Sequence, residues 1–99
     1  MAATRTTRAV NGRQGALERF SAHGCSAPRD WSNGPGDRYG WHQHTYHKTL
    51  FCLEGSIVFH TDEGDLDLHA GDRLDLDPGT AHAATVGPLG CVCVEASRP

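Results

Sequence analysis

The feature that most constrains the fold is a strict alternation of apolar and polar residues in two neighbouring segments. Residues 65–70 read DLDLHA and residues 73–77 read RLDLD, so an apolar residue, leucine or alanine, occupies every second position. Successive side chains of a β-strand point to opposite faces, and this pattern therefore predicts strands that are buried on one face only. Antiparallel sheets commonly have one packed face and one solvated face. We expect both segments to belong to an antiparallel sheet.

Further short β-like segments surround these two and are separated by turn residues. Asp62-Glu63-Gly64 predicts a hairpin turn between two of them. The further expected strands are Arg38–His44, Lys48–Glu54, Ser56–Thr61, Ala81–Val86 and Cys91–Glu95. Twelve glycines and five prolines agree with many turns. About seven short strands in some 60 residues favour an all-β sandwich or barrel over an α/β arrangement.

The N-terminal part of the chain differs from the rest. Residues 1–14 are polar and show no period, which predicts a flexible segment. Residues 16–23 are a candidate helix of one or two turns, with Leu17 and Phe20 on one face and Gly24 as its stop. A chain of 99 residues holds one core, so we expect residues 15–99 to form a single domain.

Charge and composition argue against several classes of partner. The net charge is −3 and the eight arginines are dispersed, so there is no basic footprint for nucleic acid. No run approaches the roughly 20 apolar residues of a membrane span, and the first residues lack the apolar stretch of a secretory signal. We therefore expect a cytoplasmic protein with no membrane or nucleic-acid partner. Its four cysteines are then free thiols, and none lies in a CxxC motif.

Histidine spacing points to a metal site. His42 and His44 lie two residues apart, so on a strand their side chains share a face. Such a pair alone is also compatible with a solvated strand edge. A third imidazole, His82, follows the turn Pro78–Ala81, which could return it toward the pair and complete a facial set of ligands.

These residues lie in two motifs that resemble those of the cupins. The first cupin motif, G-x5-H-x-H-x3-E-x6-G, is matched by Gly36, His42, His44 and Gly55, with Lys48 in the place of the glutamate. The second motif, G-x5-P-x-G-x2-H-x3-N, is matched by Gly71, Gly79 and His82. Asp77 and Val86 stand at its proline and asparagine positions.

The resemblance implies a fold and a cofactor. The spacer of fifteen residues between Gly55 and Gly71 is similar to that of compact single-domain cupins. The implied fold is a double-stranded antiparallel β-barrel, or jelly roll, here preceded by a short helix. The implied metal is a divalent transition ion, namely iron, manganese, nickel, copper or zinc, bound by His42, His44 and His82. Small cupins often pair their sheets, which implies a homodimer.

Lys48 is the main departure from the family pattern. An ammonium cannot ligate a metal, and its charge beside a divalent cation is unfavourable unless an anion joins them or the lysine loses its proton. One interpretation gives Lys48 a catalytic role, orienting an anionic substrate or transferring a proton. In another, it points to solvent or pairs with Glu54 or Asp77. In a third, the protein has lost its metal and keeps an ordinary binding pocket.

The remaining candidate residues have simpler interpretations. His47 is out of alternation with the pair, which favours a surface or supporting position. Cys52 shares the strand face of Lys48. Cys91 and Cys93 share one face of the last strand, from which one of them could approach the cavity, but buried cysteines more often act as small hydrophobes. Tyr46 and Trp41 could line the mouth of the barrel or serve in packing. His23, His60 and His69 have no motif support.

Two functions remain open at this level. The first is an enzyme that acts on a small anionic organic substrate at a three-histidine divalent metal, by Lewis-acid polarisation or by oxygenase-like chemistry. The second is a module that binds a small molecule or a metal without turnover, as a sensor or an accessory protein. The sequence does not separate them.

Overall fold

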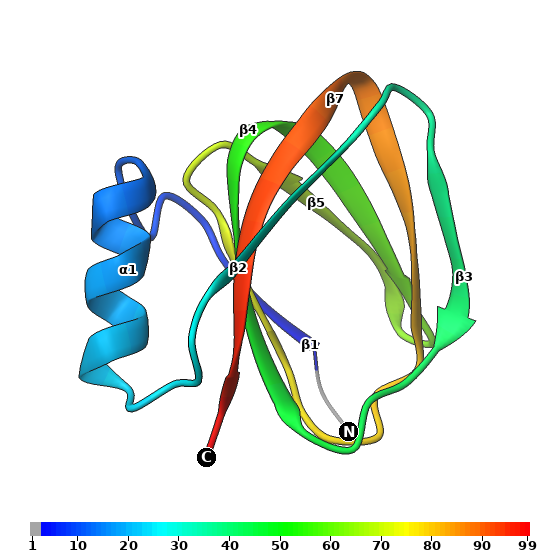
Figure 1. Cartoon of the computed structure of the whole chain (residues 1–99). Coiled ribbons are helices and arrows are strands. Elements are labelled where there is room, and N and C mark those ends of the chain that lie inside the picture. Colours follow the sequence, from blue (N-terminus) through cyan, green and yellow to red (C-terminus); the bar gives the residue numbers. More distant parts are fainter. Residues whose placement is uncertain (1–2) are drawn as a thin grey trace.

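Two long antiparallel strands, β4 (His47–Thr61) and β7 (His82–Arg98), form the centre of the molecule. In the computed structural model, which describes residues 3–99, they pair along nearly their whole lengths, from His47 opposite Arg98 to Thr61 opposite His82. Figure 1 shows the two strands side by side, both bending over the top of a barrel. Each strand therefore belongs to both halves of the barrel.

The shorter strands pair with the two halves of this central pair. β6 (Arg73–Leu76) lies beside the first part of β4, and β2 (Arg29–Asn33) lies beside the last part of β7. β5 (Gly64–His69) and β3 (Arg38–His42) pair with the other ends of β4 and β7. All of these pairings are antiparallel, which confirms the all-β antiparallel barrel expected from the sequence (Figure 1).

The strand bounds differ from the expected ones where glycines bend the chain. The predicted strands 48–54 and 56–61 are one continuous strand, β4, because Gly55 absorbs the bend with a φ of 72°. The predicted strands 81–86 and 91–95 likewise join as β7, which bends near Gly90 (φ 77°). The predicted hairpin turn is confirmed, since Thr61 faces Gly64 across it.

Gly55 is the position at which a side chain is least tolerable. A Cβ added there would lie 2.0 Å from the carbonyl oxygen of Gly90, and the positive φ is itself unfavourable for an L-residue. We expect Gly55→Ala to lower the free energy of unfolding by about 3 kcal/mol. Urea denaturation measures this loss.

Gly24 supplies the matched control for Gly55→Ala. Its φ of 66° is similar, but an added Cβ would meet nothing within 4 Å. Gly24→Ala should therefore cost only the backbone strain, about 1 kcal/mol. Equal losses in the two variants would contradict the close approach of Gly55 to Gly90.

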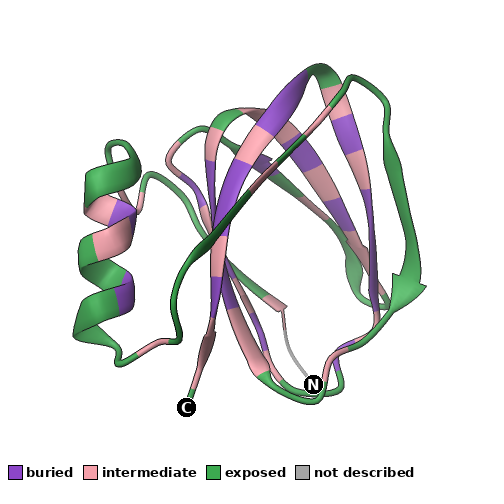
Figure 2. Ribbon diagram, viewed as in Figure 1, coloured by how far each residue is buried: buried purple, intermediate pink, exposed green. Residues whose placement is uncertain are grey.

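The buried side chains form two clusters, one inside the barrel and one outside it. The inner cluster contains Leu50, Phe59, Leu68 and Leu74, together with three of the four cysteines. The predicted alternation is confirmed for Leu68, Leu74 and Leu76, which are buried, while Leu66 is half-buried. Figure 2 shows buried positions along the strands and on the side of the helix that faces the sheet.

The helix α1 (Arg13–Ala22) covers the outer cluster. Ala16 and Phe20 are buried, and the Phe20 ring meets the Phe51 ring edge to face at 5.2 Å. Gly24 (φ 66°) follows the end of the helix as predicted: its N–H donates to the carbonyl of Ser21, and the N–H of Cys25 donates to that of Phe20. The helix starts at Arg13, three residues before the expected start, and is longer than the one or two turns predicted. Within residues 3–99, no helix is long and apolar enough to cross a membrane.

Part of the segment expected to be flexible, residues 1–14, lies in regular structure in the described chain. β1 (Ala3–Thr6) pairs with β6, and the N–H groups of Ala9 and Val10 both donate to the carbonyl of Gly71. The boundary expected at residue 15 falls inside α1. The polar sequence of residues 3–6 did not reveal β1, because backbone hydrogen bonds to the edge of β6 hold this strand in place. Residues 1 and 2 lie outside the described part.

Candidate metal centre

Three histidines from two neighbouring segments meet at one end of the barrel. His42 ends β3, His44 follows it, and His82 begins β7. The register of β3 on β7 places His42 directly opposite His82. The ring centroids lie 4.2 Å apart for His42 and His82, 5.0 Å for His42 and His44, and 5.2 Å for His44 and His82. One ring nitrogen from each histidine lies within 4.8 Å of the other two.

Backbone contacts between the two motifs support this arrangement. The turn before β7 is tied to the first motif, because the N–H of Gly79 donates to the carbonyl of His44 over 2.8 Å. His82 is only 2% exposed, whereas His42 is exposed and His44 is half-buried. The cluster therefore spans from the buried core to the mouth of the barrel.

Hydrogen bonds fix the tautomers of two of the rings. Nδ1 of His42 lies 2.7 Å from the carbonyl oxygen of Gly40, and Nδ1 of His82 lies 2.9 Å from that of Thr80. A carbonyl only accepts, so each Nδ1 is the donor, and in the neutral ring each Nε2 then keeps its lone pair. This is the usual supporting arrangement of metal-binding histidines.

The third ring has a buried nitrogen without a partner. Among the described residues, Nε2 of His44 is a buried side-chain atom with no hydrogen bond. A buried polar atom in this state is unfavourable unless a further group binds it. Together with the two fixed tautomers, this orphaned nitrogen fits a metal ion held by His42, His44 and His82.

Electrostatics favour the neutral forms of His44 and His82. Burial lowers the pKa of His44 from its ordinary value of 6.5 to about 4, and the charge of Lys48 acts in the same direction. Burial also lowers the pKa of His82; His42 and Lys48 lower it further, and the hydrogen bond to Thr80 opposes them. Neutral imidazoles are the form that binds a metal, so no proton has to leave first.

These pKa shifts predict acid sensitivity of the metal-free protein. Below pH 6.5 the unfolded chain binds protons that folded His44 and His82 resist, so stability is full above 6.5 and falls as the pH drops toward 4. Urea denaturation across this pH range measures the fall in the free energy of unfolding. This fall should be smaller in His44→Ala. A flat profile between these values would contradict the burial of the cluster.

Lys48 lies in the same cavity, paired with a carboxylate that the sequence did not suggest. Its Nζ lies 3.2 Å from Oε2 and 3.3 Å from Oε1 of Glu95, and the side chains of Lys48 and Glu95 are 11% and 16% exposed. The indole N–H of Trp31 donates to Oε1 of Glu95 over 2.7 Å. The expected alternative of a solvent-facing Lys48, or of a pair with Glu54 or Asp77, is therefore wrong.

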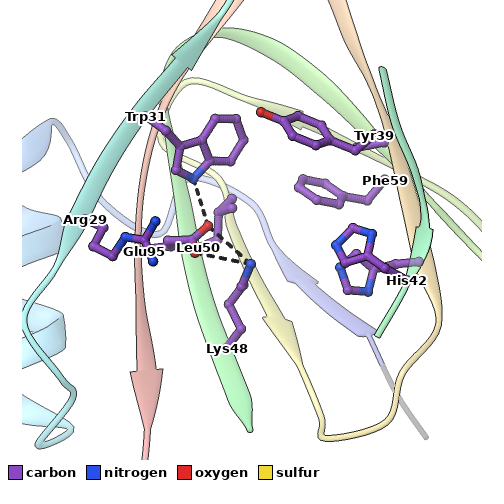
Figure 3. A pocket seen from close by; sticks show the side chains of 10 residues that line it. Arg29, Trp31, Tyr39, His42, Lys48, Leu50, Phe59 and Glu95 are labelled. Carbon is purple, nitrogen blue, oxygen red and sulfur yellow. Dashed lines mark hydrogen bonds and ion pairs between the residues drawn. The ribbon is translucent and has the colours of Figure 1, made fainter. Parts of the chain in front are cut away.

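A cavity of about 270 Å³ separates this ion pair from the histidines. Figure 3 shows Trp31, Glu95 and Lys48 on one side, with Tyr39 and His42 on the other. Phe59, Leu50 and Ala84 supply apolar lining from β4 and β7. The histidines thus line one side of the cavity, and the charged side chains of Lys48 and Glu95 line the other.

Several candidate residues from the sequence lie outside this cavity. His47 contacts Asp75 and Asp77 at 3.7 and 3.6 Å and is not part of the histidine cluster. Cys52, Cys91 and Cys93 are buried in the inner core cluster.

The other aromatic and histidine candidates do not line the cavity either. Tyr46 packs against the His44 ring at 5.0 Å, and Trp41 is 58% exposed. His60 bonds to Asp65 and Thr85, and His23 lies beside Arg73.

Glu95 is the functional residue that sequence reasoning missed. A signal for it was present, because the run Cys91-Val92-Cys93-Val94-Glu95 alternates. Side chains two positions apart on a strand share a face, so Glu95 lies on the same face as Cys91 and Cys93. Trp31, Tyr39 and Arg29 were not singled out as cavity residues, since the contacts that bring them there join distant strands.

Comparisons with known proteins agree with this architecture. A family model described as "Cupin domain" matches residues 31–94. Quercetin 2,3-dioxygenase of Bacillus subtilis (strain 168) is 43% identical over 54 residues, which are 52% of this chain and 16% of that protein. The chain therefore spans only a small part of the length of this curated relative.

Two solved structures illustrate the similarity of fold. A conserved Klebsiella pneumoniae protein with a double-stranded β-helix domain matches with a TM-score of 0.64 at 27% identity, over 73% of this chain and 62% of that one. The DMSP lyase DddQ from Ruegeria pomeroyi matches with a TM-score of 0.68 at 23% identity, over 74% of this chain and 38% of that one. The second match shows the fold alone.

Proposed function

The chain belongs to the cupin family, and from this premise we propose that it is a metal-dependent enzyme acting on a small anionic organic molecule. In this proposal His42, His44 and His82 hold a divalent transition metal. The observation that carries it is the meeting of three imidazoles, two with Nδ1 bonded to a carbonyl and one with an orphaned buried nitrogen.

The metal, when bound, would supply Lewis-acid polarisation or oxygen activation. The chain's own residues do the rest. The carbonyls of Gly40 and Thr80 orient the rings of His42 and His82. Lys48 presents its ammonium to the cavity, where it orients the substrate or transfers a proton, and Glu95 holds Lys48 in place.

The charge of the cavity supports an anionic substrate. Its lining carries two cations, Arg29 and Lys48, and one anion, Glu95, which leaves a net charge of +1 before any metal is added. A divalent ion on three neutral imidazoles adds to this positive potential. Electrostatic attraction at such a site therefore favours an anion over a neutral or cationic ligand.

The curated relative supports an enzyme but not one particular reaction. It is a dioxygenase, and the matched part is only 16% of its length. A non-catalytic module that binds a small molecule or a metal, as a sensor or an accessory protein, is the second candidate. Its support is that the ammonium of Lys48 is already neutralised by Glu95.

Incubation of the metal-loaded protein with a panel of small carboxylic acids separates the two candidates. Catalytic turnover of any acid, lost in His82→Ala, supports the enzyme. Stoichiometric binding without turnover under every metal and with oxygen present supports the binding module.

Two further proposals concern the oligomeric state of the protein and its location in the cell. We propose that the protein is a homodimer, and sedimentation that finds only monomer at micromolar concentration would contradict this. We also propose a cytoplasmic location, where its four free thiols would stay reduced.

A further inference from the structure

The cavity beside the histidines has a largely aromatic lining. Trp31 of β2 and Tyr39 of β3 contact each other edge to face, with ring centroids 5.8 Å apart. Phe59 of β4 continues the lining, and its ring centroid lies 6.4 Å from that of His82. Rings prefer edge-to-face or offset contacts with other rings, so this lining favours a planar unsaturated ligand over a branched aliphatic one.

Arg29 stands at the opposite end of the cavity from the histidines (Figure 3). It also lines an adjoining groove of about 240 Å³, together with Ser26, Tyr46 and Ser97. Within residues 3–99, its guanidinium makes no hydrogen bond or ion pair, whereas Lys48 is bound to Glu95. Arg29 is therefore the cavity-lining cation that is available to a ligand.

The chemistry of Arg29 selects among anions. A guanidinium presents a planar fork of N–H groups that matches the two oxygens of a carboxylate. Arg29 stands opposite Glu95 in the pairing of β2 with β7, and the net lining charge of +1 matches a single negative charge. A doubly charged phosphate would be repelled more strongly by Glu95.

Cavity size limits the ligand to about one ring. A volume of about 270 Å³ is nearly twice the roughly 150 Å³ of an engineered apolar cavity that binds benzene. A benzene ring with a carboxylate and one or two small substituents fills such a space.

We propose that the cavity binds a small aromatic carboxylate, whose carboxylate is held by Arg29 and whose ring lies against Trp31, Tyr39 and Phe59. Arg29 is then the residue that determines specificity. The far edge of the ring points toward His42 and His82. This inference deepens the proposed function and rests on it for the use of the site, although binding at Arg29 does not require a metal.

Calorimetric titration with benzoate and with its neutral analogue benzamide tests the inference. Arg29→Gln should weaken benzoate binding tenfold to a hundredfold and leave benzamide binding unchanged. Arg38→Gln is the matched control, because it removes the same charge from an exposed residue outside the cavity and should change neither. Cyclohexanecarboxylate should bind more weakly than benzoate to the wild type.

A second readout locates the ligand. Benzoate should shift the indole N–H resonance of Trp31, whose N–H bonds to Glu95, and should leave that of the exposed Trp41 in place. Equal benzoate affinity in wild type and Arg29→Gln would overturn the inference. So would the absence of any benzoate binding in the millimolar range.

The same titrations in zinc-loaded and metal-free protein separate this inference from the proposed function. If zinc does not bind but Arg29→Gln still weakens benzoate, the metal proposal fails and the carboxylate site stands. If zinc binds stoichiometrically and Arg29→Gln has no effect, only the carboxylate inference fails.

Discussion

The variant Lys48→Glu should lose about 3 kcal/mol or more of stability when metal-free and recover it when metal is added. The substitution places a second carboxylate against Glu95, in a position where the side chains of residues 48 and 95 are 11% and 16% exposed. Breaking a poorly solvated ion pair in this way leaves like charges together, which costs several kcal/mol. Urea denaturation of the metal-free variant measures the loss.

Metal should reverse the effect of Lys48→Glu. The new carboxylate stands at the glutamate position of the first cupin motif. A negative charge that attracts the metal ion therefore replaces a positive charge that repels it. We expect the variant to bind zinc at least tenfold more tightly than the wild type. Unchanged stability and unchanged zinc affinity together would show that residue 48 does not face the site.

Lys48→Met is the control for this variant. It removes the ammonium without adding a negative charge, and Glu95 keeps the hydrogen bond from Trp31. Its metal-free stability should fall between those of wild type and Lys48→Glu, with a loss of about 1 to 3 kcal/mol. A loss in Lys48→Met as large as in Lys48→Glu would attribute the effect to packing and not to charge.

Zinc at a hundred times its dissociation constant should stabilise the wild type by about 2.7 kcal/mol, which raises Tm by roughly 10 to 20 °C in a chain of this size. His44→Ala should abolish this shift while leaving the metal-free protein within about 1 kcal/mol of wild type. The reason is that Nε2 of His44 has no partner among the described residues, so its removal breaks no hydrogen bond there.

Thermal unfolding with and without zinc measures both quantities. A metal-free His44→Ala protein that is strongly destabilised would assign His44 a structural role. A zinc shift that persists undiminished in His44→Ala would place the metal elsewhere.

Local sequence pattern predicted the parts of the fold that depend on near neighbours. The alternating leucines placed β5 and β6 almost to the residue, and Gly24 marked the end of α1. The spacing of His42, His44 and His82 predicted a cluster that the structure brings together. In each case the pattern depends on the period of a strand or on a short turn.

The features that sequence did not reveal are set by contacts between distant strands. β1 is held by its backbone pairing with β6, and such pairing requires no apolar pattern in the sequence. Gly55 joins two expected strands through its approach to Gly90, thirty-five positions away. Glu95 is forty-seven positions from Lys48, and only the pairing of β4 with β7 brings them together.

Elemental analysis of the purified protein after reconstitution tests the central claim most directly. Wild type should retain one transition-metal ion per chain, and His82→Ala should retain none above background. His60→Ala is the matched control, since His60 bonds to Asp65 and Thr85 away from the cluster, and it should retain metal as the wild type does. A wild-type protein that holds no stoichiometric metal under any reconstitution would contradict the account.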